Sequence, residues 1–397
     1  MEGAVPTKPD SAHGRYRVAV ASSGLGHVHR GIEAWAEDLG QALRRISIDV
    51  TVFGSEPGGD IVALPCLKRT GTGAIRLAQA FRQLGGWRYG LGSTYEAEQT
   101  SFALALWWRI RRGIDILHVQ DPIIAAYCEL AHQHGLCGAK VIYANGTGEG
   151  PGRMRRFAHV QLLNPQAYAA WQPLKPPGQM TFMIPNFVDT DRFSPGNRSK
   201  ARADLGLPQD RVILLCSAAI RRYHKRVDYL LAEFARVLAH TDRDILLVIA
   251  GGREADTGEL IAEGKALLGD RVHFIPDFAR DRMPELYRAA DLFVLPSLYE
   301  MSSVALLEAM ATGLPVICHD VPGFREVVGP AGRFIDLSDS GALAAGILEL
   351  LANEPRAALA REARPRAEAC LSAGAVVPQI VQMYSSVLGE DVNARRR

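Results

Sequence analysis

The sequence predicts an α/β protein made of two doubly wound domains, and three observations carry that prediction. The chain has 397 residues, which is long enough for two domains that each enclose a hydrophobic core. Residues 17–21 form a mostly apolar run. A glycine-bearing loop and a helical pattern over residues 32–45 follow it, which is the order of strand, loop and helix found in parallel α/β units. Apolar residues 212–217 begin the same order of strand, loop, helix and strand again. We therefore expect similar domains in the two halves.

The other apolar runs continue this alternation. The pattern predicts further strands over residues 48–53, 115–119, 141–143, 160–163, 245–250, 272–275, 292–295 and 316–318. It predicts two amphipathic helices within residues 54–112, a short helix and turn over 197–210, and helices over 341–354, 355–371 and 376–388.

Composition excludes several classes of protein. The net charge is +2 and nearly half of the residues are apolar, so nothing in the overall charge indicates a nucleic-acid partner. The six cysteines are dispersed without a C-x-x-C pair, which favours free thiols in a reducing compartment over disulfides or a zinc site. No apolar run is long enough to span a membrane, and the first residues do not form a signal peptide. We expect a cytoplasmic protein.

The most informative stretch covers residues 291–326. A short strand ends at Pro296, and Ser302 or Ser303 can cap the helix that follows, because a hydroxyl can accept from the free N–H groups of a first turn. Gly313 ends this helix before the next strand. The stretch therefore predicts a strand, loop, helix, loop and strand.

Two carboxylates stand at different places in this stretch. Glu300 lies in the loop before the helix, and Glu308 lies within the helix in an almost wholly apolar run. Because an unpaired buried carboxylate is costly, Glu308 needs hydrogen-bond donors. Ligand hydroxyls, a backbone amide or a neighbouring basic side chain could each supply them.

The whole stretch carries a recognisable motif. It contains PS-x-x-E-x7-E-A-M-A-x-G-x-P-V followed by GFREVV, and it resembles the donor-site signature of retaining glycosyltransferases of the GT-B fold, glycosyltransferase family 4 (glycosyl transferases group 1). The segment 183–195, MIPNFVDTDRFSP, is similar to a second motif of that family, with Phe187 in place of a glycine. The resemblance implies two Rossmann-like domains that face an interdomain cleft, and a C-terminal helix that crosses back to the first domain.

The resemblance also divides the chain. We expect a flexible tail over residues 1–14, an acceptor-side domain over 15–190, a nucleotide-sugar-binding domain over 191–374, the crossover helix over 375–390 and a basic tail over 391–397.

The reaction implied is the transfer of a sugar from a nucleotide sugar, a UDP- or GDP-sugar, to an acceptor hydroxyl with retention of the anomeric configuration. The acceptor would be a glycan, a lipid or a small molecule. The resemblance implies no cofactor besides this donor and no nucleic-acid partner.

The resemblance assigns roles to individual residues. Departure of a nucleotide diphosphate develops negative charge, which preorganised cations stabilise. Lys225 with Arg221 or Arg222 would supply these cations, Glu308 would bind the ribose, and Glu300 would bind the donor sugar. The implied catalytic residues are Lys225, Arg221, Glu300 and His118, and the implied donor-binding residues are Gly31, Arg222, Gly251, Phe278, Met301, Ser302, Ser303 and Glu308.

Besides Phe187, four positions depart from the family pattern, namely Arg30, Gln120, Ile220 and Ser303. Because Gln120 stands where the family has a histidine, His118 is either a sugar contact or a packed strand residue. The departures motivate a second hypothesis, a catalytically degenerate protein that binds a sugar nucleotide. A third is a nucleotide-sugar epimerase of the GT-B fold.

Two other patterns have ordinary explanations. The triplets Asp189-Thr190-Asp191 and Asp242-Arg243-Asp244 could hold a divalent metal, but their positions favour polar turns, and we expect no metal. Arginines and aromatic residues alternate over 76–112, where two helices with solvated arginines are favoured. A face of these helices that rests on the inner surface of a membrane remains the alternative.

Overall fold

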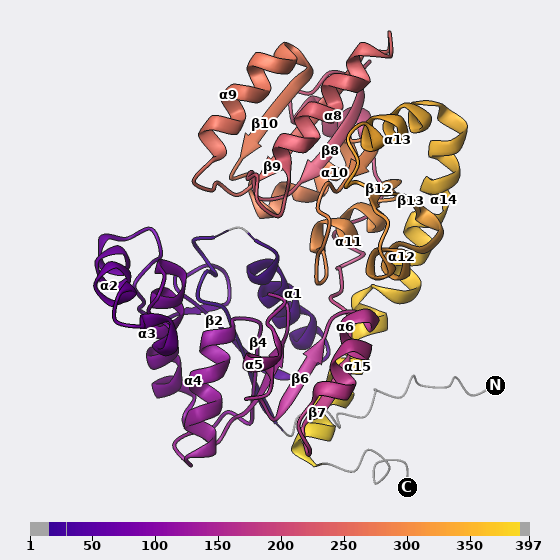
Figure 1. The fold of residues 1–397 in the computed structure, drawn as a ribbon. Coiled ribbons are helices and arrows are strands. Elements are labelled where there is room, and N and C mark those ends of the chain that lie inside the picture. Colours follow the sequence, from indigo (N-terminus) through magenta and orange to yellow (C-terminus); the bar gives the residue numbers. More distant parts are fainter. Residues whose placement is uncertain (1–15, 29, 390–397) are drawn as a thin grey trace, which may run out of the picture.

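The computed structural model describes residues 16–28 and 30–389. They form two lobes, each built around its own parallel sheet (Figure 1). The expected tails over residues 1–14 and 391–397 lie outside the described residues.

The first lobe contains a seven-stranded sheet in the order β3-β2-β1-β4-β5-β6-β7. Every pairing is parallel, and Val18 of β1 lies opposite both Val50 of β2 and Ile116 of β4. The strand order reverses between β1 and β4, the place where parallel sheets usually bind ligands. The strands are β1 (Arg17–Ala21), β2 (Asp49–Gly54), β3 (Ile61–Ala63), β4 (Ile116–Val119), β5 (Lys140–Ala144), β6 (His159–Leu162) and β7 (Met180–Met183).

The second lobe contains a six-stranded parallel sheet in the order β10-β9-β8-β11-β12-β13. Its order reverses between β8 and β11, so the loop after β8 and the loop after β11 meet at one edge. The strands are β8 (Val212–Ser217), β9 (Ile245–Gly251), β10 (Val272–Pro276), β11 (Leu292–Val294), β12 (Val316–His319) and β13 (Gly332–Ile335).

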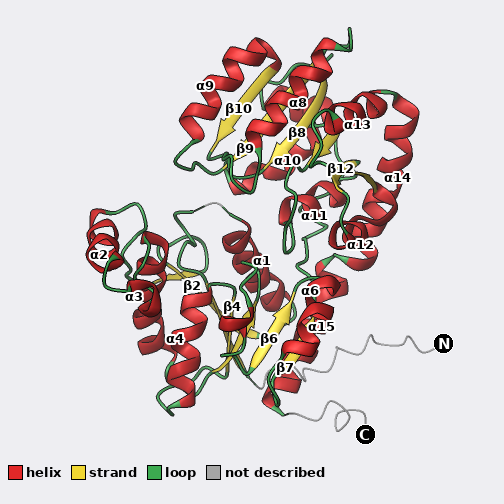
Figure 2. Ribbon diagram, in the orientation of Figure 1, coloured by secondary structure: helices red, strands yellow, loops and turns green. Residues whose placement is uncertain are grey.

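Helices cover both sheets (Figure 2). Alternate residues of β1 enter the cores on opposite faces of its sheet, Val18 and Val20 on one and Ala19 and Ala21 on the other. The helices are α1 (Gly31–Arg45), α2 (Thr72–Arg82), α3 (Thr94–Ile110), α4 (Pro122–Gln133), α5 (Pro151–Met154), α6 (Pro165–Trp171), α7 (Arg198–Asp204), α8 (Val227–Ala239), α9 (Thr257–Leu268), α10 (Met283–Ala289), α11 (Val304–Ala311), α12 (Pro322–Val328), α13 (Ala342–Leu351), α14 (Asn353–Cys370) and α15 (Ala373–Leu388).

The last helix belongs to the first lobe, as Figure 1 shows in yellow. Val376, Ile380 and Tyr384 of α15 enter the same core as β1. Lys140 Nζ donates to the carbonyl oxygen of Val387 over 2.6 Å, which fixes the end of the helix against β5. The predicted crossing of the C-terminal helix to the first domain is confirmed.

The two helices predicted within residues 54–112 are α2 and α3. Trp87 and Trp108 are 63% and 61% exposed, and the Arg111 guanidinium lies 3.6 Å from the Trp108 ring centroid. No helix among the described residues is long and apolar enough to cross a membrane. Contact of this face with a membrane surface stays an untested alternative to the favoured pair of helices with solvated arginines.

Candidate active site

A cavity of about 400 Å³ lies between the two lobes at the carboxyl ends of both sheets. The second lobe contributes the loop between β8 and α8, the end of β9 and the start of α11. The first lobe contributes the loop after β1 and the first two turns of α1. Its volume falls within the range of small-molecule sites.

Most of the predicted site residues line this cavity. Those that do are Gly31, Arg221, Lys225, Gly251, Phe278, Glu300, Ser302, Ser303 and Glu308. The structure therefore brings together residues from five segments that are separate in the sequence.

The loop before α8 holds Lys225 in an unusual backbone. His224 and Arg226 have φ angles of 70° and 50°, in the left-handed region that residues other than glycine rarely adopt. Arg226 fixes this conformation by donating to the carbonyl oxygen of Leu337 over 2.8 Å and by stacking on Tyr229. Strained loops of this kind cluster at functional sites.

Glu300 lies beside this loop. Its carboxylate pairs with Lys225 Nζ and lies 3.2 Å from His224 Nε2. Burial opposes ionisation, but the charge of Lys225 and the ring of His224 outweigh it and lower the Glu300 pKa to about 2. Lys225 is therefore available to an anionic ligand only in competition with Glu300. His224 is a cavity residue that the sequence did not single out.

Arg221 lines the same wall of the cavity. Within the part of the chain that the structure describes, its guanidinium forms no ion pair with a carboxylate. An uncompensated cation in a cavity favours an anionic ligand.

Glu308 is buried within α11, as its sequence context predicted. Its donors are protein side chains: Tyr287 donates from its hydroxyl over 2.8 Å, and Arg280 Nη1 pairs with the other carboxylate oxygen. A carboxylate accepts about four hydrogen bonds, so Glu308 retains capacity for ligand hydroxyls.

Arg280 connects this carboxylate to the other lobe. Its Nη2 donates over 2.9 Å to Asp38, which lies on α1. Burial raises the Asp38 pKa to about 6, although Arg280 acts in the opposite direction. The sequence missed Arg280 because the surrounding ARDR segment has the pattern of an exposed polar turn.

Gly251 is required by close packing. A Cβ at this position would lie 1.9 Å from the carbonyl oxygen of Ala218, and its φ is 155°. No larger residue allows β9 to end this close to the loop that carries Arg221.

The start of α11 faces the cavity through Ser302, Ser303 and Val304. Ser303 occupies the N-cap position but its side chain makes no capping hydrogen bond, contrary to the expected hydroxyl cap. Backbone N–H groups at the first turn of a helix favour anions.

Three predicted residues lie away from the cavity lining. His118 is fully buried in β4: its Nδ1 lies 2.8 Å from the Tyr384 hydroxyl and its Nε2 lies 2.7 Å from Gln161 Oε1. Burial lowers its pKa to about 3. Of the two alternatives for His118, this burial supports the packed strand residue over the sugar contact.

Arg222 pairs with Glu263 on α9 and does not line the cavity. Met301 is buried, and its carbonyl oxygen accepts from Asn164 Nδ2 of the first lobe over 2.9 Å. Its backbone therefore contributes to the contact between the lobes, and Met301 is not among the residues that line the cavity.

The two acidic triplets lie in turns with protein partners. Asp189 pairs with Arg45 at 2.7 Å, and Asp244 lies 3.1 Å from Arg211. Among residues 16–28 and 30–389 no group of three or more potential metal ligands gathers.

Similarity to known proteins extends over this site. Residues 197–367 match the family model described as glycosyl transferases group 1. A curated D-inositol 3-phosphate glycosyltransferase from Geodermatophilus obscurus is 36% identical over 228 residues, which cover 55% of this chain and 50% of the relative. The chain spans about half the length of such curated relatives.

Solved structures match nearly the whole chain. Sucrose-phosphate synthase from Thermosynechococcus elongatus has a TM-score of 0.75 at 21% identity, over 95% of this chain and 100% of that one. Anabaena Alr3699/HepE in complex with UDP-glucose has a TM-score of 0.69 at 16% identity, over 94% and 100%. The protein therefore has the two-domain α/β GT-B fold, and its second lobe carries a segment that matches the glycosyl transferases group 1 model.

Proposed function

We propose that this protein is a glycosyltransferase that moves a sugar from a nucleotide sugar to an acceptor hydroxyl, with retention of the anomeric configuration. The observation that carries the proposal is the composition of the second-lobe wall of the cavity. An unpaired cation at Arg221, a cation at Lys225, the free amides at the start of α11 and a buried carboxylate at Glu308 converge there. Together they suit a diphosphate flanked by hydroxyl-bearing rings.

The cations would bind the diphosphate. Arg221 would contact it throughout, and Lys225 would move from Glu300 toward it as the sugar bond breaks and charge accumulates on the leaving group. Fixed cations that meet developing charge are among the largest contributions to catalysis. The amides at Ser302 and Ser303 would add to this effect, and Gly31 at the start of α1 leaves room for the phosphates.

The two carboxylates would bind different parts of the donor. Glu308 would accept from the ribose hydroxyls, because Arg280 and Tyr287 hold its side chain in place. Glu300, which lies next to Lys225, would accept from hydroxyls of the donor sugar. Gly251 and Phe278 would border the base. Retention and attack from the same face as the leaving group rest on the family resemblance.

UDP is the first nucleotide to test, since a similar structure was solved with UDP-glucose. We expect no requirement for a metal ion, because the cations and amides of the cavity can balance the diphosphate charge. Full activity after chelation would support this expectation, and activity restored only by magnesium or manganese would contradict it. We propose a cytoplasmic location.

The test is incubation with a panel of UDP- and GDP-sugars, read by mass spectrometry. Transfer or slow hydrolysis of one donor supports the proposal. Isomerisation without transfer would favour the epimerase, and binding without any reaction would favour the catalytically degenerate protein. Lys225→Ala should lower turnover by about a hundredfold, the loss expected for one transition-state donor. The matched control is Lys265→Ala on α9, an exposed lysine outside the cavity.

A further inference from the structure

The wall of the cavity that faces away from the proposed donor site has its own chemistry. The cations proposed for the diphosphate belong to the second lobe, so the first-lobe wall remains for the acceptor. Its polar residues are Arg30, Glu33, Glu37, Gln120 and Asn186, and the remainder is largely apolar. We call this surface the acceptor wall.

The cation of the acceptor wall is already neutralised. Arg30 Nη2 lies 2.6 Å from Glu254 Oε1, so its charge is shared with a carboxylate of the second lobe. Glu33 and Glu37 form no ion pair with any described residue. The described part of this wall therefore carries an excess of negative charge.

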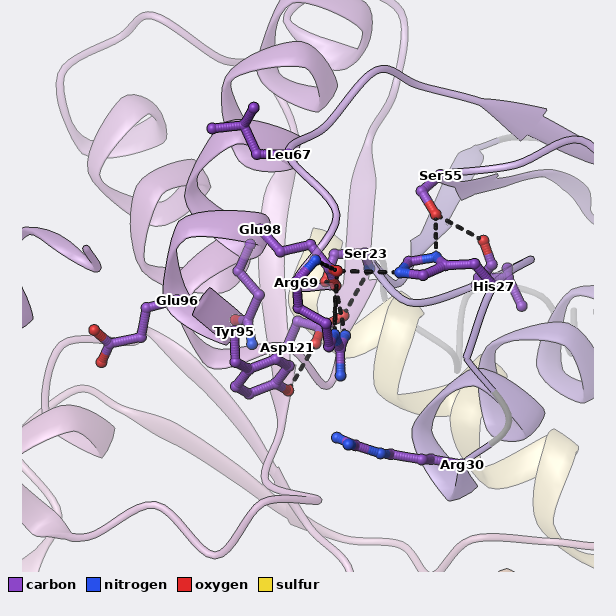
Figure 3. A network of polar contacts seen from close by, with 12 residues as sticks. Ser23, His27, Arg30, Ser55, Leu67, Arg69, Tyr95, Glu96, Glu98 and Asp121 are labelled. Atoms are coloured by element: carbon purple, nitrogen blue, oxygen red, sulfur yellow. Dashed lines mark hydrogen bonds and ion pairs between the residues drawn. The ribbon is translucent and has the colours of Figure 1, made fainter. Parts of the chain in front are cut away.

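The cations behind the wall are also committed. Arg69 donates from Nε to Glu98 over 3.0 Å and lies 4.6 Å from the Tyr95 ring centroid, and Figure 3 shows it beside both residues. Lys68 pairs with Glu56. Asp121, which accepts from Ser23 N and the Tyr95 hydroxyl, adds a further acidic group to the same network.

Glu33 is held in this wall at some cost. It is 5% exposed, and burial together with the charge of Asp121 raises its pKa to about 7. Gly24 makes room for it, since a Cβ on Gly24 would lie 2.0 Å from Glu33 Oε1. Glu37 follows one turn later on the same side of α1. A buried carboxylate with a raised pKa that lines a cavity is a candidate for function.

We propose, on the basis of the proposed glycosyl transfer, that the acceptor is an uncharged sugar or cyclitol and that a phosphorylated acceptor is disfavoured. Carboxylates and side-chain amides accept from and donate to hydroxyl groups, which is the chemistry of a polyol. Above pH 7 a phosphate dianion on this wall would meet the carboxylates of Glu33 and Glu37, whereas the described cations of the first lobe on and behind the wall already pair with other carboxylates. This differs from the acceptor in the name of the curated relatives, D-inositol 3-phosphate.

The test compares acceptors in matched pairs with the donor that the panel identifies: myo-inositol with D-inositol 3-phosphate, and glucose with glucose 6-phosphate. We expect kcat/KM for the uncharged member of each pair to be higher by about tenfold or more, because the carboxylates of the wall repel a phosphate group. Preference for a phosphorylated member would overturn the proposal. Hydrolysis of the donor without transfer to any of these four acceptors would overturn the assignment of a small polyol as the acceptor.

Two variants connect the result to the wall. At pH 8, above the Glu33 pKa of about 7, Glu33→Gln and Glu37→Gln should each reduce the discrimination severalfold, because each removes a charge that repels phosphate. Glu96→Gln, whose side chain points away from the network in Figure 3, should leave it unchanged. Unchanged discrimination in both wall variants would contradict the inference. Calorimetry with UDP separates the proposal about the acceptor from the proposal of glycosyl transfer. If the unmodified protein did not bind the nucleotide, the glycosyl transfer itself would be contradicted.

Discussion

At the scale of single residues, the sequence predicted two carboxylates that line the cavity but not their partners. Glu300 and Glu308 are singled out by the motif that contains them, whereas Lys225 meets Glu300 across 75 positions of the chain and Arg280 meets Glu308 across 28. Such contacts depend on the order of the parallel strands in the sheet, and the spacing of residues in the sequence does not encode that order. His118 is packed because it shares a strand face with Ile116, and that face packs against α15.

Glu33 gives a pH-dependent prediction at this scale. Its pKa is raised from 4.5 to about 7, so the folded state binds more protons than the unfolded state between these values. Stability attributable to Glu33 therefore falls as pH rises through this window, by about 3 kcal/mol at most. The neutral variant Glu33→Gln should gain stability relative to the unmodified protein at pH 8 and much less at pH 5.

Urea unfolding at both pH values measures this difference, with Glu96→Gln as the control. If Glu33→Gln changed the free energy of unfolding equally at pH 5 and pH 8, Glu33 would not be a buried carboxyl with a raised pKa.

At the scale of elements, long periodic segments were predicted well. Helix α1 and strands β8, β9 and β10 appear within a residue or two of their expected bounds. The strands β3, β7 and β13 were missed, because runs of three or four residues at a sheet edge carry too little periodic signal. The loop before α8 was predicted as basic, but its left-handed residues at His224 and Arg226 could not be foreseen.

Gly251 tests how closely these elements pack. Gly251→Ala would place a Cβ against the carbonyl oxygen of Ala218 and push the loop that carries Arg221. We expect destabilisation by about 1–3 kcal/mol or more, as for other overpacked sites, together with weaker donor binding. Gly258→Ala in α9 is the control, since a Cβ there meets nothing within 4 Å. A Gly251→Ala variant as stable as Gly258→Ala would refute the packing argument.

At the scale of the whole molecule, the sequence predicted two lobes and a returning helix but none of the polar contacts between the lobes. Arg280 joins Glu308 to Asp38, Arg30 joins Glu254, and Asn164 donates to the carbonyl oxygen of Met301. Two of these contacts involve residues of the cavity wall. Occupation of the cavity and the relative position of the lobes are therefore expected to influence one another.

Asp38→Asn tests this connection. It weakens a charged hydrogen bond, which contributes about 1.5–3 kcal/mol, and should shift the unliganded protein toward a more open arrangement. Small-angle X-ray scattering should record a larger radius of gyration, while Glu37→Gln, on the same helix, should not change it. The unmodified protein should open similarly below about pH 6, because protonation of Asp38 removes the same charge. Identical scattering from Asp38→Asn at pH 7.5 would contradict the role of this contact.

We propose above that the second-lobe wall of the cavity binds the nucleotide of a sugar donor. Calorimetric titration with UDP and GDP tests it most directly. The unmodified protein should bind one of them, and Glu308→Gln should bind it about tenfold more weakly, a difference near 1.4 kcal/mol. Glu300→Gln should bind it equally well or more tightly, because Lys225 loses its competing partner. Absence of binding by the unmodified protein, or weakening by Glu300→Gln alone, would contradict the account.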